Sequence, residues 1–600
     1  MGKAARLSRQ TRRRAQERRK KEPHRTGSVR SGSRPSRSGS LAIPLILAAG
    51  LFAYHNSLHG AFVMDDLPAI PQNTTIRSLW PPWAVFSPPA QTAVAGRPLV
   101  NLSLALNYAV GRESVVSYHA FNLMIHLLAA LVLFGIIRRT LRGPGLEIRE
   151  ATGIATVAAL LWVVHPLASE SVDYTIQRTE LLMGLFFLMT LYCAIRGFDS
   201  PGRPGWYVAA VTAFALGLGS KEVIVMAPVI VFVYDWLFRS PSLSDAFRRH
   251  WRLYAGFAGV LALFVLLVAT RFRRVFAGMV GRSVTPWDYA LTESGVIVHY
   301  LRLAFWPHPL VADYDGWPIA ASVGSVLPFL AVVVALVALT LWGLARRQKL
   351  AFLGTWFFLI LAPTSSFRPI RSEIAGERRM YLPLAAVVVL IVLVGRALLS
   401  RWGAPRAAAI TAVAVAAVTL SLVTVRRNDD YGTTLSFWSD VVAKRPDNPR
   451  AHMSLGDYFL ARGEGKEALA HYSEAVRLRP GSPKAQYDLA IVLASQGRLE
   501  EAIEHYRETL RVYPENASAH NNLAAALAGR HDVDGAIEHY REAIRIEPGH
   551  AVAHYNLALA LGERGRTEEE IQHLEAAVRL QPNFAQARQT LADLQSRASQ

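Results

Sequence analysis

The sequence predicts an all-α protein in which a polytopic bundle of transmembrane helices is followed by an α-solenoid built from repeats. Two observations predict this fold class. Residues 41–425 form a succession of apolar runs, most of them near the roughly 17 to 25 residues that cross a bilayer. After Arg426 the composition changes, and prolines then recur every 34 residues. Because 52% of the 600 residues are apolar and only 18% are charged, an average soluble enzyme is excluded.

The first forty residues are strongly basic. Residues 1–40 hold 14 Lys and Arg against two acids and contain almost no apolar side chain, so we expect them to be disordered. A basic tail can bind nucleic acid, but this tail directly precedes the apolar run that begins at Leu41. Positive charge beside a first span retains a tail in the cytoplasm. We therefore predict a cytoplasmic tail with no nucleic-acid partner and no cleaved signal peptide, because the basic region is too long for one.

The membrane domain is predicted over residues 41–425 with about eleven spans. A twelfth run, 290–306, contains Glu293, His299 and Arg302 and is either a further span or an interfacial helix. If it does not cross, most Lys and Arg between spans fall on the cytoplasmic side and the chain after the last span lies outside the cytoplasm. The exceptions would be Arg271, Arg273, Arg274 and Arg282. The eleven predicted spans are 41–58, 119–137, 152–168, 179–197, 205–220, 223–239, 253–270, 322–345, 350–366, 380–400 and 407–425.

The 34-residue period identifies tetratricopeptide repeats over residues 447–600, after a connector at 426–446. Each repeat has leucine, small residues, and an aromatic residue or leucine at the same positions. Small residues at fixed positions allow the two helices of a pair to pack closely. The fourth repeat departs from the pattern with Glu570 at a small position, and residues 583–600 are predicted to form a capping helix. The repeated prolines are Pro446, Pro480, Pro514, Pro548 and Pro582.

A disulfide framework and a cysteine-ligated metal site are excluded, because Cys193 is the only cysteine and lies within an apolar run. We assign no metal ligands and leave open whether a divalent ion is needed.

Two adjacent carboxylates, Asp65 and Asp66, follow the first predicted span in the segment FVMDDLPAI. Adjacent acids are common on solvated loops, but an ionised carboxylate at the membrane edge is suited to accept the proton of an attacking hydroxyl. Their spacing does not decide which one acts, and we favour Asp66.

Charged residues from four further segments are predicted on the same outer face. Charged residues that are buried or lie at the membrane edge are candidates for function. Carboxylates near guanidinium groups are suited to recognise a lipid-borne phosphate. The alternative is that these residues are ordinary solvated charges or form salt bridges between loops. The residues are Arg97, then His165, Glu170, Asp173, Arg178 and Glu180, then Lys221 and Glu222, and then Glu377, Arg378, Arg379 and Tyr381.

Taken in order, these motifs resemble the transmembrane and tetratricopeptide-repeat-containing protein O-mannosyltransferases of the C-type glycosyltransferase superfamily. The matching segments are FVMDDLPAI (62–70), GRPLVNLSLALNYAVG (96–111), YHAFNLMIHLL (118–128), HPLASESVDYTIQRTELL (165–182), SKEVIV (220–225), YLRLAFWPHPLVADY (300–314) and ERRMYLP (377–383).

The resemblance implies an inverting transfer of one hexose, mannose, from a polyprenyl-phosphate sugar to Ser/Thr hydroxyls of proteins on the outer face of the membrane. It implies that Asp65 and Asp66 bind or deprotonate the acceptor, and that Arg97, Arg178, Lys221 and Arg378 hold the lipid phosphate, with His165, Glu170 and Glu222 among the substrate-binding residues. The polyprenyl-phosphate sugar is then a co-substrate, and the repeats recruit the acceptor polypeptide. The alternatives are a non-enzymatic membrane-anchored scaffold and a ligase or transporter of lipid-linked glycans.

Overall fold

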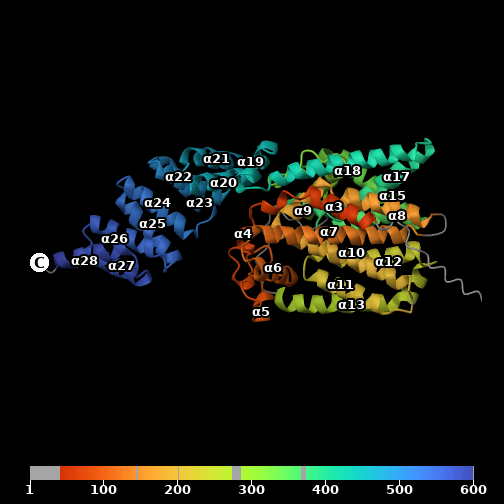
Figure 1. Cartoon of the computed structure of the whole chain (residues 1–600). Coiled ribbons are helices and arrows are strands. Elements are labelled where there is room, and N and C mark those ends of the chain that lie inside the picture. Colours follow the sequence, from red (N-terminus) through yellow and green to blue (C-terminus); the bar gives the residue numbers. More distant parts are fainter. Residues whose placement is uncertain (1–40, 143–145, 201, 273–284, 366–372, 599–600) are drawn as a thin grey trace, which may run out of the picture.

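The computed structural model describes residues 41–142, 146–200, 202–272, 285–365 and 373–598, without the side chains of 268–272 and 597–598. The predicted tail at 1–40 and Arg273, Arg274 and Arg282 lie outside these ranges, as does the side chain of Arg271. A bundle of long helices forms one part of the molecule, and the repeats extend from one end of it (Figure 1). The predicted all-α class is confirmed.

Each of the eleven predicted spans forms a helix. Among the described residues, six helices are long and apolar enough to cross a membrane, or seven if the bent pair Ile148–Val163 and Pro166–Asp173 counts as one span. The chain is therefore a multi-pass membrane protein. The helices are α3 (Ala42–Ala53), α7 (Val115–Thr140), α8 (Ile148–Val163), α10 (Arg178–Phe198), α11 (Gly205–Leu218), α12 (Ala227–Phe238), α13 (Leu243–Phe272), α15 (Val323–Ala345), α16 (Ala351–Leu361), α17 (Pro383–Arg401) and α18 (Arg406–Asp429).

Several of these helices are shorter than the apolar runs that predicted them. α3 has 12 residues and α16 has 11, so each rises less than about 20 Å, against roughly 30 Å of bilayer core. The runs at 152–168 and 223–239 also break, because residues 166–177 and 222–226 form short 3₁₀ segments and, at Ser169–Asp173, one short α-helix. The count of eleven full spans therefore stays a prediction.

The run at 290–306 lies within α14 (Pro286–Phe305). The Tyr289 hydroxyl donates to the Thr364 carbonyl at 2.9 Å, and the Tyr300 hydroxyl donates to the Gly376 carbonyl at 2.9 Å. Thr364 and Gly376 belong to the segment between α16 and α17 that leads to Arg378. These hydrogen bonds tie both halves of α14 to this segment, and α14 also packs against α15. Whether 290–306 is a further span or an interfacial helix stays open.

The repeat region confirms the 34-residue period. Four antiparallel helix pairs are followed by α28 (Ala585–Ala598). The pairs are α20 (Pro449–Ala461) with α21 (Gly465–Leu478), α22 (Pro483–Ser495) with α23 (Leu499–Val512), α24 (Ala517–Gly529) with α25 (Val533–Ile546), and α26 (Ala551–Glu563) with α27 (Thr567–Leu580).

Close packing within the pairs explains the small residues. A Cβ on Gly456 would lie 2.6 Å from the ring of Tyr472, so the first pair requires glycine there. The exception, Glu570, is accommodated by Gly562, whose missing side chain leaves the space that the Glu570 carboxylate fills. A large residue at one position of the fourth repeat is thus offset by a small one opposite it.

The first repeat is docked on the bundle through the loop between α14 and α15. Asn448 Nδ2 donates to the carbonyl and the carboxylate of Asp313 at 3.0 and 3.1 Å. Arg450 pairs with Asp313 at 2.8 Å, and Arg479 pairs with Asp315 at 2.8 Å. The predicted connector is itself mostly helical, since α18 ends at Asp429 and α19 (Thr434–Lys444) packs on α20. The repeats are therefore fixed against the bundle.

The loop after α3 lies on the same face as the repeats. The Ala61 N–H donates to the Tyr431 carbonyl at 3.2 Å, and Asn56 Nδ2 donates to the Val425 carbonyl at 2.8 Å. Tyr431 lies three residues before the start of α19. The aspartates at 65 and 66 and the repeats consequently share one end of the bundle, as predicted from the alternation of spans.

Three repeats contain a histidine pair between their two helices. In each pair the first histidine places Nε2 against the proline carbonyl six residues earlier, so its Nδ1 accepts a hydrogen bond from the partner's Nδ1–H. In the second repeat Gln486 takes the place of the first histidine and contacts His505. The pairs are His452–His471, His520–His539 and His554–His573, with Nδ1–Nδ1 distances of 3.1, 3.1 and 3.0 Å.

These pairs predict an acid-sensitive repeat region. Burial lowers the pKa of His471, His539 and His573 below the ordinary histidine value. Between the lowered pKa values and about pH 6.5, the unfolded chain binds more protons than the folded chain. The stability of the folded repeats is therefore full above about pH 6.5 and decreases as the pH falls through this window. Hydrogen exchange of the full-length protein, corrected for intrinsic rates, should show decreasing protection of α20–α27 from pH 7 to pH 5. The triple variant with glutamine at these positions should respond less, and an unchanged response would contradict the assignment.

Candidate functional site

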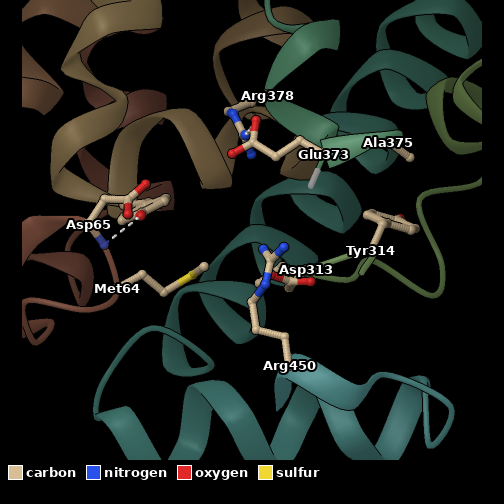
Figure 2. A pocket seen from close by; sticks show the side chains of 10 residues that line it. Met64, Asp65, Asp313, Tyr314, Glu373, Ala375, Arg378 and Arg450 are labelled. Atoms are coloured by element: carbon tan, nitrogen blue, oxygen red, sulfur yellow. Dashed lines mark hydrogen bonds and ion pairs between the residues drawn. The ribbon is translucent and has the colours of Figure 1, made fainter. Parts of the chain in front are cut away.

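A pocket lies where the bundle meets the first repeat (Figure 2). Its volume is about 340 Å³ when the space on its solvent-open side is included. Its walls come from the loop after α3, the turn before α10, the loop between α14 and α15, the segment before α17, and α20. The lining residues are Met64, Asp65, Tyr174, Ala312, Asp313, Tyr314, Glu373, Ala375, Arg378 and Arg450.

The structure separates the two adjacent aspartates. Asp66 begins the short helix α4 (Asp66–Ala69) and is 0% exposed. Its carboxylate accepts the N–H of Val63 at 3.1 Å and the N–H of Ile176 at 2.7 Å. Burial raises the pKa of Asp66 to about 8, although these donors act in the opposite direction. Asp66 therefore joins two loops, and our preference for it as the base is not supported.

Asp65 is the aspartate that reaches the pocket. Its side chain is exposed, and its backbone N–H donates to the Tyr174 hydroxyl at 3.0 Å. Partial burial and, after it, the nearby charge of Glu373 raise the pKa of Asp65, while Arg378 opposes the rise. A carboxylate whose pKa lies above its ordinary value is a better proton acceptor toward a hydroxyl than an unperturbed one.

Arg378 is the cation on the opposite wall of the pocket. Its guanidinium pairs with both Glu170 and Glu373, and its backbone N–H donates to Glu170 at 2.7 Å. Glu170 is buried, whereas the Glu373 side chain is 41% exposed. The positive charge of Arg378 lowers the pKa of Glu373 and outweighs burial, which would raise it; Lys221 lowers it further. The Glu373 carboxylate therefore lies in the field of two cations.

The other predicted outer-face charges form ion pairs beside this pocket. Lys221 Nζ lies 2.5 Å from Glu180, in a largely buried pair. Arg97 lies 3.9 Å from Glu222, at the surface, and neither residue lines the pocket. The structure thus brings together Asp65, Glu170, Arg378 and, at longer range, Lys221.

Arg178 is predicted to hold the lipid phosphate, but the structure places it away from the pocket. Arg178 is 0% exposed and donates to the side-chain oxygens of Asn122 and Asn107 at 2.7 and 2.8 Å and to the Tyr118 carbonyl at 2.9 Å. The first turn of α10 points this side chain against α6 (Pro98–Gly111) and α7. Its guanidinium fastens helices together and does not reach the pocket.

His165 also lies outside the pocket and is hydrogen-bonded to the protein itself. Its Nδ1 accepts the N–H of Leu167 at 3.2 Å, and its Nε2 donates to the Ala304 carbonyl at 3.2 Å. The buried ring therefore ends α8 and anchors α14. Of the remaining predicted charges, Glu377 accepts the Tyr314 hydroxyl at 2.8 Å and Arg379 pairs with Glu293 at 3.3 Å, both buried.

Eight of the ten lining residues were not predicted as site residues, and five of these are polar: Tyr174, Asp313, Tyr314, Glu373 and Arg450. Asp313 and Tyr174 lie within the quoted motifs but without a distinguishing pattern. Arg450 belongs to the first repeat, where the 34-residue template gives no reason to single it out. Figure 2 shows it reaching from the repeat toward Asp313. Within the described ranges no group of three or more metal-ligating side chains occurs, and the question of a divalent ion stays untested.

Comparisons with known proteins agree with this architecture. Residues 95–269 match the family model of dolichyl-phosphate-mannose-protein mannosyltransferases. Residues 447–515, 487–551 and 529–585 match models of the tetratricopeptide repeat.

Similar curated proteins span most of this chain. Protein O-mannosyl-transferase F38B6.6 of Caenorhabditis elegans is 25% identical over 71% of this chain and 61% of its own length. Human protein O-mannosyl-transferase TMTC1 is 25% identical over 74% of this chain and 56% of its own length, so this chain spans about three fifths of these relatives. A solved tetratricopeptide-repeat protein, YrrB, aligns with 26% of the chain at 20% identity and a TM-score of 0.25. The mannosyltransferase-type match in the membrane region, followed by these repeats, makes the chain similar to the transmembrane and tetratricopeptide-repeat-containing protein O-mannosyltransferases.

Proposed function

We propose that this protein transfers mannose from a polyprenyl-phosphate donor to Ser/Thr hydroxyls of polypeptides at the pocket that contains Asp65. The observation that carries the proposal is an exposed carboxylate at the junction of a membrane bundle and a repeat array, opposite the cation Arg378. A lipid-borne donor reaches such a junction from the membrane, and a polypeptide reaches it along the repeats. The names of the curated relatives support the sugar and the type of acceptor.

The proposed step is a single displacement with inversion at the sugar. Asp65 takes the proton of the acceptor hydroxyl while the hydroxyl oxygen forms a bond to C1 of mannose. The bond between C1 and the phosphate oxygen breaks, and polyprenyl phosphate leaves with the bonding electrons. Arg378 and Lys221 would stabilise the charge that develops on this phosphate.

Glu373 occupies the place that the donor phosphate would take in this scheme. Its carboxylate contacts Arg378 and lies in the field of Lys221, and its partial exposure leaves it free to move aside. A bound phosphate would have to displace it. Glu373 is therefore proposed to compete with the donor.

Replacing Glu373 by glutamine tests this competition. The change keeps the side-chain volume but removes the repulsion between its carboxylate and the donor, so we expect a KM for the donor roughly tenfold lower with an unchanged kcat. The variant Glu147→Gln, which removes an exposed carboxylate from the opposite end of the bundle, is the matched control. A higher KM in Glu373→Gln would mean that Glu373 assists donor binding.

The repeats are proposed to present the acceptor on the extracytoplasmic side of the membrane. Arg450 of the first repeat forms part of the wall that contains Asp313. A polypeptide held along the array would thus end beside Asp65 without crossing a flexible linker.

The function is tested with the purified full-length protein and a Ser/Thr peptide. Polyprenyl-phosphate mannose, polyprenyl-phosphate glucose and GDP-mannose are offered separately, and the configuration of the product linkage is determined by NMR. We expect transfer only from the lipid-phosphate mannose, with inversion at C1. Transfer from none of them would favour a scaffold, and transfer of a preassembled glycan would favour a ligase.

A further inference from the structure

An apolar groove lies between α7, α16 and α17, away from the Asp65 pocket. It has a volume of about 1300 Å³ including its open side. Apart from Thr140, Lys349 and the indole of Trp356, its lining is entirely aliphatic or phenyl. The lining residues are Leu133, Ile136, Ile137, Thr140, Leu141, Leu146, Leu191, Phe238, Lys349, Leu350, Phe352, Leu353, Trp356, Ala385, Ala386, Val389 and Leu393.

The groove opens at the end of the bundle that faces away from the repeats. His119, near the start of α7, lies close to Gly60 on the repeat side, so Thr140 marks the other end of that helix. In Figure 1 the bundle extends from its junction with the repeats toward the end that lies farthest from them. From Thr140 to Leu133 the groove follows α7 for roughly 10 Å into the bundle. Its shape and lining suit a hydrocarbon chain that enters beside the membrane surface.

Cations surround the mouth of the groove. Arg138, Arg139 and Arg142 lie at the end of α7, Arg239 follows α12, and Lys349 lines the groove itself. Asp199 pairs with Arg139 at 3.5 Å and with Arg239 at 2.9 Å. Burial, and then crowding by Arg138 and Arg139, lowers the pKa of Arg142. Even with the exposed Glu147 beside Leu146, the five cations outnumber the acids here.

Three of these guanidinium groups keep an unused donor. Among the residues that the structure describes, the Nε–H groups of Arg138, Arg142 and Arg239 are shielded from solvent and meet no acceptor. Shielded donors without acceptors are costly, and a phosphate oxygen is a strong acceptor for guanidinium groups. Basic pockets between transmembrane helices bind anionic lipid headgroups.

We propose that this groove is a binding site for an anionic glycerophospholipid. One acyl chain fills the apolar groove, and the phosphate lies at its mouth between Lys349 and Arg142. The excess of cations selects an anionic headgroup over a zwitterionic one, whose own cation would meet the arginines. This site is separate from the Asp65 pocket and does not depend on the proposed transfer reaction.

The test begins with the full-length protein extracted in a mild detergent from membranes that contain phosphatidylglycerol and phosphatidylcholine. Lipids that remain bound after gel filtration are quantified by mass spectrometry. We expect phosphatidylglycerol to be retained, and the variant Arg142→Gln/Lys349→Gln to retain it about tenfold less, since two charge-assisted contacts are lost. The variant Ala386→Phe, which fills the groove with a ring, should show the same loss. The control Arg401→Gln/Arg406→Gln removes two exposed cations from the ends of α17 and α18.

The outcomes are distinguishable. Loss of phosphatidylglycerol in the charge variant, with wild-type retention in the control and an unchanged gel-filtration profile, supports the site even if Ala386→Phe fails to fold. Equal retention in the charge variant and the wild type would overturn it, as would equal retention of phosphatidylcholine. Retention of polyprenyl phosphate in place of phosphatidylglycerol would assign the groove to the donor and overturn the proposal, whereas failure of the transfer assay would leave this result unaffected.

Discussion

Replacing Asp65 by asparagine is expected to lower mannose transfer by about 10²-fold to 10⁴-fold, the usual cost of a lost general base. The substitution keeps the side-chain volume and the backbone contact with Tyr174. Because the side chain is exposed at the pocket, the bundle should fold as in the wild type. The assay is transfer from polyprenyl-phosphate mannose to a Ser/Thr peptide, with the gel-filtration profile as the control for folding.

Asp66→Asn is the matched comparison, and it should fail in a different way. The two backbone N–H groups bind different oxygens of the Asp66 carboxylate, so asparagine would place its NH₂ group against one of these donors. We expect lower thermal stability and a proportional loss of folded protein. If Asp66→Asn were stable but inactive while Asp65→Asn kept full activity, the two roles would be exchanged.

The pH profile gives an independent check on Asp65. A general base must be deprotonated, so activity should fall as pH drops through its pKa, which lies above the ordinary aspartate value. Glu373→Gln removes one cause of this rise in the free enzyme, so the acid limb of kcat/KM should move to lower pH in that variant. No movement of the limb would separate the titrating group from Asp65.

Replacing Arg178 by methionine should destabilise the bundle. Methionine keeps much of the length and apolar volume but leaves the side-chain oxygens of Asn122 and Asn107 and the Tyr118 carbonyl without their donor. Each buried acceptor left unpaired costs about 1–3 kcal/mol, so we expect an apparent melting temperature lower by roughly 5 °C or more.

Thermal unfolding followed by gel filtration measures this change. Arg112→Met, which removes an exposed arginine on the same face, is the control and should melt like the wild type. The KM for the donor in the folded fraction should stay unchanged, because Arg178 does not reach the pocket. Wild-type stability with a raised KM would restore the phosphate-binding role.

Most of the architecture follows from local sequence patterns. Apolar runs and a 34-residue period are properties of neighbouring residues, so they predicted the bundle and the repeats without knowledge of the fold. The same patterns placed Asp65, Glu170 and Arg378 at one end of the bundle, because alternating spans return every second loop to the same side. Helix ends were less predictable: apolar composition continues through Tyr54 and the turns after α8, where the helices stop.

The sequence by itself therefore determined the fold class, the repeat register and the end of the bundle where the charged loops gather. Only the tertiary structure decided which charges face solvent. Asp65 and Asp66 are chemically identical neighbours, and they differ because Ile176, 110 residues away, binds one of them. Arg178 is buried by α6 and α7, and Arg450 enters the pocket because the first repeat docks on Asp313. Exposure of a single side chain depends on segments that are distant in the chain, and no local period encodes their packing.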